Sequence, residues 1–434
     1  MTSEIHQQLN GYNGEYRDSE KRNFHIEVCQ RNNSALKSED IKSIVKHHLK
    51  RHPQFVAETV LSSDPSLNKH VEKLSVYSEE DESLVKFEHI PYDEDRLSIY
   101  TYRLHKDEHE EELLDDEEQE ELPAASHWML PSYEFSDSWD SLYYDTKVKM
   151  NLINYAVTGL LFADKGVNQE LISWNRVVLL HGPPGTGKTS LCRALAHKIA
   201  IRLSNRFPTA SLLEVNSHSL FSKWFSESGK LVMKMFRKVE ELVENESHLV
   251  CLLIDEVESL TAARASVAGG TEPSDAIRVV NALLTQIDKL KRYKNILILT
   301  TSNVTEKIDV AFVDRADIKF YIGLPSAFAI YGMYRSCVNE LIRVGIVYPK
   351  EPLHPNPADL SSTDKICQNS ILLLEISKAS DGLSGRTIRK LPFLAHSYFL
   401  HNKTHVTFRV FADALSKAAA QQFRERANLG KQET

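Results

Sequence analysis

The spacing of apolar residues changes along the chain and predicts three kinds of structure in turn. In the first part, apolar and polar positions alternate in "FHIEVCQ" and "LSIYTYRL", as in half-buried strands, whereas "SEDIKSIVKHHL" repeats its apolar residues along one helical face behind Ser38, a predicted N-cap. We expect a small α+β domain over residues 23–105, preceded by a disordered stretch over residues 1–22. The domain pattern contains no nucleophile, metal cluster or phosphate loop, so it indicates recognition or regulation, with a purely structural role as the alternative.

The middle of the chain has continuous apolar runs instead of alternating ones. The runs "RVVLL", "LVCLLI" and "NILIL" are typical of strands that are buried on both faces of a parallel sheet. After the first run, Leu191, Leu195 and Ile199 recur every fourth residue, as on one face of a helix. Strands that alternate with helices predict an α/β domain, which we place at residues 125–325.

From Ser326 onward the pattern is helical. Amphipathic or apolar stretches separated by Gly, Pro and Asn are "FAIYGMYRSCVNELIRVGI", "SILLLEISKAS", "RTIRKLPFLAHSYFL" and "VFADALSKAAAQQFRERA". We therefore expect a helical lid over residues 326–434 that follows the sheet domain. Such a lid could change its angle to the sheet domain by a hinge motion.

Composition agrees with a globular protein of two or three domains. The chain has 434 residues, of which 42% are hydrophobic and 26% are charged. No run of about eighteen apolar residues occurs, and the N-terminus lacks an apolar core segment, so we expect an intracellular protein with no membrane association. The five cysteines are scattered without close pairs, which predicts reduced, structural thiols.

One acidic run carries most of the negative charge. The stretch "DEHEEELLDDEEQEE" contains eleven Asp or Glu residues, and subtracting them from the net charge of −8 leaves +3 for the rest of the chain. Blocks of like charge are usually solvated, so residues 106–124 are interpreted as an acidic linker. The remainder is not basic enough to predict direct nucleic-acid binding.

A glycine-rich loop carries the first chemical signal. In "RVVLLHGPPGTGKTSLC" a strand leads into Gly182, four residues, Gly187, Lys188 and Thr189, and then into a helix, which is the context of a phosphate loop. Backbone N–H groups at the helix N-terminus would hold the β-phosphate, Lys188 would reach the β- and γ-phosphates, and Thr189 would ligate Mg²⁺. The predicted nucleotide-binding residues are Gly182, Pro183, Pro184, Gly185, Thr186, Gly187, Lys188, Thr189 and Ser190.

Polar residues at the ends of two later strands complete the predicted site. Asp255 and Glu256 follow the run "LVCLLI", and Asn303 follows "NILILTTS". Ligands of open α/β sheets lie beyond the carboxyl ends of the strands, so these side chains should emerge beside the phosphates. Asp255 would hold the Mg²⁺ shell, Glu256 would polarise the attacking water, and the Asn303 amide would orient that water.

The motifs "GPPGTGKT", "LLIDEVESL", "ILTTSN" and "IDVAFVDRADIKFYIGLP", in this order, resemble the ATPase module of AAA+ proteins over about residues 127–430. The surrounding sequence, including "VNSHSLFSKWFSESGKL" and "GLSGRTIRKLPFLAH", more closely resembles the pachytene checkpoint ATPases, also called thyroid-receptor-interacting AAA+ proteins. This resemblance implies a P-loop ATPase fold with a five-stranded parallel sheet and a helical lid after the α+β domain. It also implies remodelling of HORMA-domain proteins.

The resemblance assigns a role to an aromatic pair in a polar loop. Trp224 and Phe225 stand in "SLFSKWFSESGK", where apolar periodicity is missing. In AAA+ rings this segment is a pore loop, so the two aromatics would project into a central channel and grip an unfolded client. Residues Arg264 to Asp275 could line the same channel, and an ordinary surface loop is an equal alternative there.

Two arginines complete the site that the resemblance implies. Arg315, in "VDRAD", aligns with the finger that one subunit offers to the γ-phosphate of its neighbour, although many relatives carry two arginines there. Arg386, in "GLSGRTIRK", matches a lid arginine that touches the γ-phosphate in cis. The sequence thus predicts ATP and Mg²⁺ as cofactors and catalytic roles for Glu256, Asn303, Arg315 and Arg386.

The resulting hypothesis is an ATP-driven homohexamer that pulls on HORMA-domain clients of the spindle checkpoint and of meiotic chromosome axes. The family resemblance implies that the N-terminal domain docks the client and a HORMA-like adaptor. It implies a nuclear and cytoplasmic location, with chromosomes or kinetochores reached through clients. Two alternatives are a DNA-acting AAA+ motor or loader and a nucleotide-gated scaffold that needs no turnover.

Overall fold

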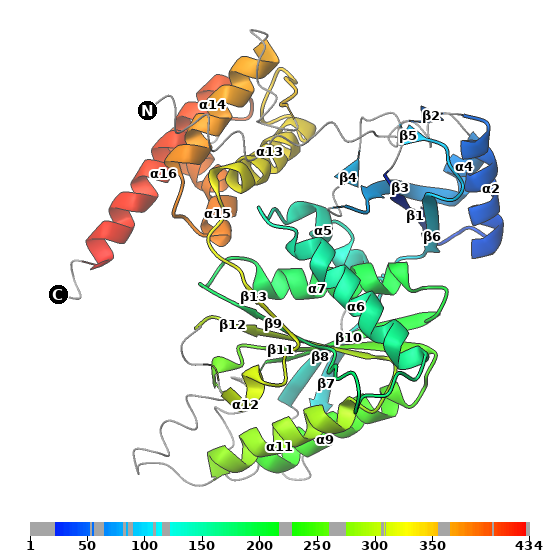
Figure 1. The fold of residues 1–434 in the computed structure, drawn as a ribbon. Helices are drawn as coiled ribbons and strands as arrows, with labels where there is room; N and C mark the ends of the chain where they lie inside the picture. The colour runs from blue at the N-terminus through cyan, green and yellow to red at the C-terminus, as the bar shows by residue number, and fades with distance from the viewer. Residues whose placement is uncertain are drawn as a thin grey trace. The chain divides into compact units, whose positions relative to one another are not determined.

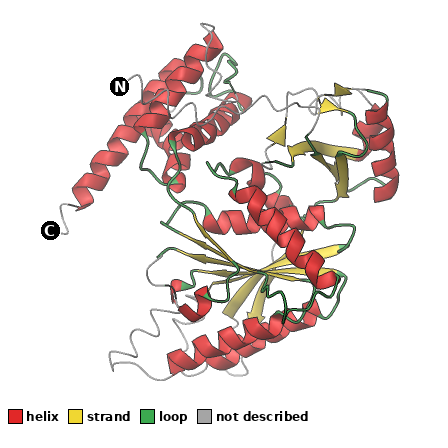
Figure 2. Cartoon of the chain, viewed as in Figure 1, coloured by secondary structure: helices red, strands yellow, loops and turns green. Residues whose placement is uncertain are grey.

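The computed structural model describes residues 22–52, 54–55, 65–80, 84–85, 90–106, 110–114, 122–216, 228–259, 275–304, 308, 310–354, 365–401 and 403–430. The chain divides into two compact units. The first unit comprises residues 1–105 with residues 201–206, and the second comprises residues 106–200 with residues 207–434. Figure 1 labels the elements of both units, and Figure 2 separates helices from strands by colour.

The first unit is built on a four-stranded sheet with strand order β4-β3-β1-β6. Its central strand β1 (Phe24–Gln30) pairs antiparallel with β3 (Val71–Ser78) and parallel with β6 (Leu97–Tyr102). Its other elements are α2 (Ser38–Lys50), β2 (Gln54–Phe55), α4 (Pro65–His70), β4 (Leu84–Val85) and β5 (Ile90–Pro91). Apolar residues of β1, β3 and α2 form one core, which confirms the α+β prediction.

The cap of α2 differs from the prediction. Ser38 is the first residue of the helix, and Lys37 occupies the N-cap position. The Lys37 side chain has no carboxylate or hydroxyl oxygen to accept a backbone N–H, as a Ser or Asp cap would. Instead the Asp40 carboxylate accepts the Lys37 backbone N–H at 3.4 Å, which supplies a partner at the helix start from within the first turn.

The second unit contains the predicted parallel sheet. Five strands run parallel in the order β13-β9-β12-β11-β10. These strands are β9 (Val177–His181), β10 (Thr209–Asn216), β11 (His248–Asp255), β12 (Ile296–Ser302) and β13 (Ile318–Tyr321). Side chains of β11 and β12 are buried almost throughout, as their continuous apolar sequences predict.

The central sheet has more strands than the five predicted from the sequence. Strand β8 (Leu122–Leu130) pairs antiparallel with β10 and makes a central sheet of six mostly parallel strands. Strand β7 (Glu110–Leu114) pairs antiparallel with β8 at the outer edge and lies within the acidic segment expected to be a linker. The sequence of β8, "LPAASHWML", has neither a continuous apolar run nor strict alternation, so its pattern gave no strand signal.

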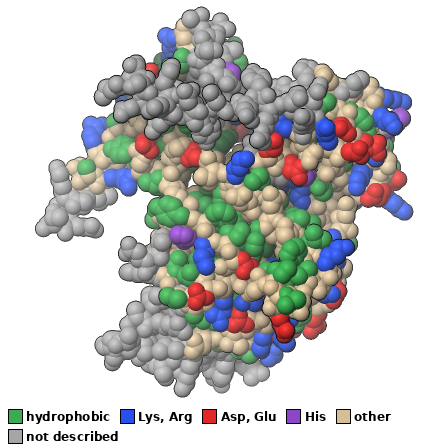
Figure 3. Space-filling model, viewed as in Figure 1, with side chains coloured by type: hydrophobic (Ala, Val, Ile, Leu, Met, Phe, Trp, Pro, Cys, Tyr) green, Lys and Arg blue, Asp and Glu red, His purple; other side chains and the backbone are tan. Residues whose placement is uncertain are grey.

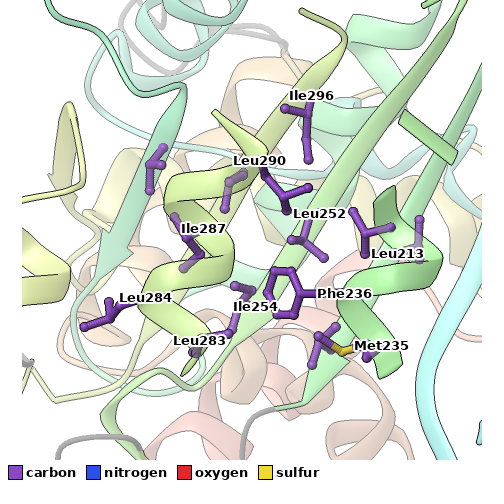
Figure 4. Packing of buried hydrophobic residues seen from close by; sticks show 14 of the residues in the cluster. Leu213, Met235, Phe236, Leu252, Ile254, Leu283, Leu284, Ile287, Leu290 and Ile296 are labelled. Carbon is purple, nitrogen blue, oxygen red and sulfur yellow. The ribbon is translucent and has the colours of Figure 1, made fainter. Parts of the chain in front are cut away.

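Helices cover both faces of the central sheet (Figure 1). Helices α6 (Val148–Asp164) and α7 (Lys188–Arg202) lie on one face, and α9 (Ser228–Val243) and α11 (Asp275–Leu290) lie on the other. Figure 4 shows apolar residues of α9 and α11 packed against β10, β11 and β12, with the Phe236 ring among them. Shorter elements are a 3₁₀ turn (Tyr133–Phe135), α5 (Ser138–Ser141) and α12 (Val310–Val313).

The end of the chain is helical, as the sequence predicts. It contains α13 (Ala327–Arg343), α14 (Lys365–Ala379), α15 (Gly385–Ala395), a π-helical turn (His396–Leu400) and α16 (Phe408–Gly430). These helices share a separate apolar core that includes Tyr334, Leu373, Leu391 and Phe411. The lid therefore has an apolar core of its own within the second unit.

On the face shown in Figure 3, Lys and Arg side chains are interspersed with Asp and Glu side chains, so neither sign of charge dominates. Within the described ranges, every helix is too short or too polar to span a lipid bilayer.

Candidate nucleotide-binding and catalytic site

The glycine-rich loop joins strand β9 to helix α7, at the carboxyl edge of the sheet. Gly182 has a φ of +139°, and a Cβ at this position would lie 2.3 Å from the Ile322 carbonyl oxygen, so only glycine fits there. The Gly182 N–H donates to the Ser302 carbonyl at 3.2 Å, which ties the loop to the end of β12. The loop geometry therefore rests on both neighbours of β9 in the sheet, β12 and β13.

Lys188 is the first residue of α7, and its side chain turns back into the loop. Its Nζ donates to the carbonyl oxygens of Gly182 and Pro183 at 2.9 and 2.8 Å, and the residue is only 4% exposed. Burial lowers the pKa of the Lys188 ammonium, and the carboxylates of Glu258 and Asp255 offset part of this effect. Lys188 thus presents a buried positive charge at a helix N-terminus, as phosphate binding requires.

Thr189 and Asp255 lie in direct contact where the sequence predicts the metal site. The Thr189 hydroxyl donates to Asp255 Oδ1 at 2.9 Å. Strand β11 delivers Asp255 at its last residue, and α7 delivers Thr189 in its first turn. A hydroxyl with one carboxylate fits Mg²⁺, which in nucleotide sites takes few protein ligands and completes its shell with waters and phosphate oxygens.

Glu256 adopts an unusual backbone conformation. Its φ is +58°, a left-handed value that disfavours residues with a Cβ. The Glu256 N–H donates to the Thr301 hydroxyl at 3.2 Å, and the Asn303 Nδ2 donates to Glu256 Oε1 at 3.4 Å. Asn303 therefore lies beside Glu256, where the sequence placed it, and its own N–H donates to Glu258 Oε1 at 3.1 Å.

The start of lid helix α15 contacts the phosphate loop. Ser384 caps α15 by accepting the Thr387 N–H, and the Arg386 N–H donates to the Gly185 carbonyl at 3.0 Å. Gly185 has a φ of +77°, and a Cβ there would meet Ser384 Oγ at 3.0 Å. Burial is the main cause of the lowered pKa of Lys188, and the charge of Arg386 lowers it a little further. Arg386 is thus brought to the loop of its own chain.

A segment before α6 also packs on this loop, although it was not among the predicted site residues. The Tyr144 hydroxyl donates to the Gly187 carbonyl at 3.4 Å, and burial raises the pKa of this phenol. The carboxylate of Asp145 accepts from the backbone N–H of Ser326 at 3.2 Å and also from its hydroxyl, at the cap of α13. The signal was an aromatic pair in a polar stretch, "SLYYDTK", which is the same kind of signal that singled out Trp224 and Phe225.

Arg315 is hydrogen-bonded to residues outside the phosphate loop. Its Nε lies 3.1 Å from both Asp288 carboxylate oxygens, its Nη2 donates to Asp288 Oδ2 at 2.7 Å, and its Nη1 donates to the Ala311 carbonyl at 2.6 Å. Among the described residues, the hydrogen bonds of the Arg315 guanidinium are made with Asp288 and Ala311 and not with the phosphate loop. This position agrees with an arginine that does not serve the nucleotide of its own chain.

The predicted pore residues cannot be placed in the same way. Trp224 and Phe225 lie outside the described residues, as do residues 264–274 of the second predicted loop. The structure therefore brings together Lys188, Thr189, Asp255, Glu256 and Asn303, and it adds the backbone of Arg386. Arg315 instead pairs with Asp288.

Three family models match separate parts of the chain. A model described as "ATPase family associated with various cellular activities (AAA)" matches residues 178–324. The "TRIP13 N-terminal domain" matches residues 19–107, and the "TRIP13-like, AAA+ ATPase lid C-terminal domain" matches residues 326–423.

Individual relatives agree over nearly the full length. The "Pachytene checkpoint protein 2 homolog" of Mus musculus is 53% identical over 413 residues, covering 93% of this chain and 94% of the mouse protein. The Homo sapiens homolog is 52% identical over 419 residues, covering 95% and 96%. The solved structure of C. elegans PCH-2 matches with a TM-score of 0.74 and 36% identity, covering 93% of this chain and 100% of that one. The chain thus belongs to the TRIP13/PCH2 family of AAA+ ATPases, and it is an ATP-hydrolysing enzyme.

Proposed function

We propose that this ATPase is a homohexameric remodeller that pulls on HORMA-domain proteins. ATP hydrolysis is best supported by one observation: Lys188, Thr189 and Asp255 lie together at one edge of the sheet. Glu256 follows Asp255 in the chain. The relatives are named pachytene checkpoint proteins, and the choice of client follows from the resemblance of the sequence to ATPases that remodel HORMA-domain proteins.

The hydrolytic step follows from the positions of these side chains. Backbone N–H groups of the loop and Lys188 would bind the β- and γ-phosphates, and Thr189 and Asp255 would hold Mg²⁺. Mg²⁺, when bound, neutralises charge on the phosphate oxygens. Glu256 accepts a proton from the attacking water, and Asn303, 3.4 Å from its carboxylate, orients that carboxylate and the water.

Two arginines sense the γ-phosphate from different sides. Arg386 approaches from the lid of the same chain, because its backbone is bonded to Gly185 of the loop. Arg315 acts in trans from the neighbouring subunit, and its hydrogen bonds to Asp288 and to the Ala311 carbonyl hold its guanidinium in place for this role. An arginine supplied in trans can accelerate phosphoryl transfer by roughly 10³- to 10⁵-fold, so hydrolysis becomes dependent on assembly.

The pore loop transmits the energy of hydrolysis to the client protein. Trp224 and Phe225 of each subunit grip the client chain, and the motion of the lid, whose α15 touches the phosphate loop, moves these loops in turn. The N-terminal unit recognises the client and a HORMA-like adaptor. The enzyme would then work in the nucleus and cytoplasm, on spindle-checkpoint and meiotic axis proteins, with no direct contact with nucleic acid.

A client-conversion assay with purified full-length protein tests this proposal. A closed HORMA-domain protein and a candidate adaptor are mixed with enzyme and ATP, and ATPase rate and client conversion are measured together. Glu256→Gln should bind ATP but lose both activities, and Trp224→Ala should keep ATP hydrolysis but lose conversion. Normal conversion by Trp224→Ala would overturn the pulling role.

Two further outcomes identify the alternatives. Stimulation of the ATPase by DNA, and not by the HORMA client, would support a DNA-acting motor. Release of client by Glu256→Gln at the normal rate would support a nucleotide-gated scaffold. Sedimentation with ATP tests the hexamer, since a monomer at working concentration would leave Arg315 without a neighbouring site.

A further inference from the structure

The side chain of Thr301 bridges the two acidic residues of the site. Thr301 is in the buried strand β12 and is 1% exposed. Its hydroxyl donates to Asp255 Oδ1 and accepts the Glu256 N–H at 3.2 Å. Its backbone carbonyl accepts the Val257 N–H at 2.9 Å. One residue therefore holds three consecutive residues at the end of β11.

The bond to Glu256 acts on a backbone that needs support. A left-handed conformation is unfavourable for a residue with a Cβ, and it persists only where the surroundings fix it. Glu256 has a φ of +58°, and the hydrogen bonds of its N–H and of the following N–H both end on Thr301. These two bonds fix the direction in which the Glu256 carboxylate leaves the chain.

The bond to Asp255 acts on the other side of the site. Thr189 and Thr301 both donate to Asp255 Oδ1. Two hydroxyl donors from different elements fix the rotation of this carboxylate, so that it faces the start of α7. A threonine or serine hydroxyl can donate to one group and accept from another at the same time, whereas valine of the same shape can do neither.

We propose that Thr301 is a positioning residue for ATP hydrolysis. It orients Asp255 toward Thr189 and holds Glu256 in the conformation that aims its carboxylate at the attacking water. Thr301 touches neither nucleotide nor water in this role and acts through the two acids. The inference rests on the roles proposed above for Asp255 and Glu256.

The adjacent residue provides a matched control. Thr300 is also in β12, is 0% exposed, and donates its hydroxyl to the Val178 carbonyl at 2.8 Å. Successive side chains of a strand point to opposite faces, so Thr300 lies on the face away from the acids. Thr300→Val and Thr301→Val each remove one buried hydroxyl from the same strand, but only the second removes contacts to Asp255 and Glu256.

The test compares Thr301→Val, Thr301→Ser and Thr300→Val in the full-length enzyme. ATPase kcat and KM, Mg²⁺ dependence, binding of a fluorescent ATP analogue and the thermal midpoint are measured for each. Thr301→Val should lower kcat by at least about tenfold, because displacing a catalytic group by 1 Å can cost about 10²-fold. Its KM and nucleotide affinity should stay within about threefold, and half-maximal activity should need more Mg²⁺.

The two other variants decide between positioning and general stability. Thr301→Ser should recover most of the lost kcat, since serine keeps the hydroxyl. Thr300→Val should lose thermal stability to a similar extent yet keep kcat within about twofold. If Thr301→Val does not yield folded protein, Thr301→Ala replaces it and is judged by the same criteria.

The inference is overturned if Thr301→Val hydrolyses ATP at the wild-type rate, or if Thr300→Val loses as much kcat at the same midpoint. Glu256→Gln separates this failure from a failure of the proposed function. An inactive Glu256→Gln beside an active Thr301→Val overturns only the role of Thr301. An active Glu256→Gln overturns the proposed role of Glu256 itself.

Discussion

Arg202 and Glu27 form a buried ion pair in the first unit, with 2.7 Å between Arg202 Nε and Glu27 Oε1. The two side chains are only 4% and 3% exposed. The Arg202 guanidinium also lies 5.2 Å from the Tyr100 ring centre and 5.8 Å from that of Tyr77. Aromatic faces attract a cation, so the desolvated guanidinium is matched by one carboxylate and two rings.

Removing one partner of this pair should destabilise the protein. Glu27→Gln leaves the Arg202 charge buried without its counter-ion, which typically costs about 3–5 kcal/mol. Thermal unfolding of the full chain should show an earlier transition for the first unit. The matched control is Lys46→Ala, which breaks the Lys46–Glu94 pair of the same unit, where the side chains are 48% and 53% exposed. An unchanged midpoint for Glu27→Gln would contradict the prediction.

Asp288 should matter for the action of Arg315. It binds the Nε and Nη2 of Arg315, while Ala311 binds Nη1, so one N–H on each of Nη1 and Nη2 is left for a phosphate. Partial burial raises the pKa of Asp288, but hydrogen bonds from Arg315 and Lys291 outweigh it and keep this pKa below its ordinary value. Asp288 is therefore charged at neutral pH and preorganises the guanidinium.

We expect Asp288→Ala to lower kcat of the assembled enzyme by about tenfold, less than the loss from Arg315→Ala, because it loosens the arginine without removing it. In an Arg315→Ala background, Asp288→Ala should cause no further loss of kcat. Glu340→Ala breaks an exposed Arg343–Glu340 pair in the lid and serves as the control. Additive losses in the double variant would show that Asp288 does not act through Arg315.

The contact between the phosphate loop and the lid should be sensitive to one methyl group. Gly185→Ala would bring a Cβ to 3.2 Å from Arg386 Cβ and 3.0 Å from Ser384 Oγ, at a φ of +77°. Gly345 has nearly the same φ, +79°, but a Cβ there meets nothing within 4 Å. Both substitutions should cost about 1–2 kcal/mol of stability through the backbone, whereas only Gly185→Ala should raise KM for ATP. An equal KM in the two variants would argue against the lid contact.

Stability should fall in mild acid because of His248. This imidazole is buried and bonded to Ser211 Oγ and Thr209 Oγ1, each at 2.8 Å. Burial, and secondarily the charge of His127, lowers the pKa of His248 below its ordinary value of 6.5. The unfolded chain therefore binds more protons below about pH 6.5, and the contribution to stability that is complete above this value is lost as pH falls.

The check is the thermal midpoint between pH 7.5 and pH 5. The wild type should lose stability over this range, and His248→Gln should flatten this dependence, since glutamine retains hydrogen-bonding groups but does not titrate. The same slope in both proteins would assign the acid sensitivity to another group, of which His181, whose pKa is also lowered by burial, is the first candidate.

Local patterns made the nucleotide site predictable. Each of its parts follows a continuous apolar strand, and parallel strands end at one edge of a sheet, so the order of motifs placed Lys188, Asp255 and Asn303 together. The position of Thr301 in the site had no such signal. A threonine in a buried strand fits β-propensity alone, and only the register of β12 beside β11 reveals its bonds.

Side-chain pairs between distant parts of the chain, and strands of mixed polar and apolar composition, could not be predicted from the sequence. Arg202 and Glu27 are 175 residues apart, and each has an ordinary place in its own element. Strand β8 is recognised only through its partner β10, because its own composition is mixed. The Asp288–Arg315 pair likewise joins α11 to the residues after α12, and helical periodicity gives no information about such a contact.

The resting place of Lys188 bears on how the enzyme repeats its cycle. Its ammonium has acceptors of its own in the Gly182 and Pro183 carbonyls, so departure of ADP and phosphate does not strand a buried charge. When the next ATP binds, the Lys188 ammonium would exchange these carbonyl oxygens for phosphate oxygens. The free-energy cost of releasing the product is lowered accordingly, because the ammonium always has oxygen partners.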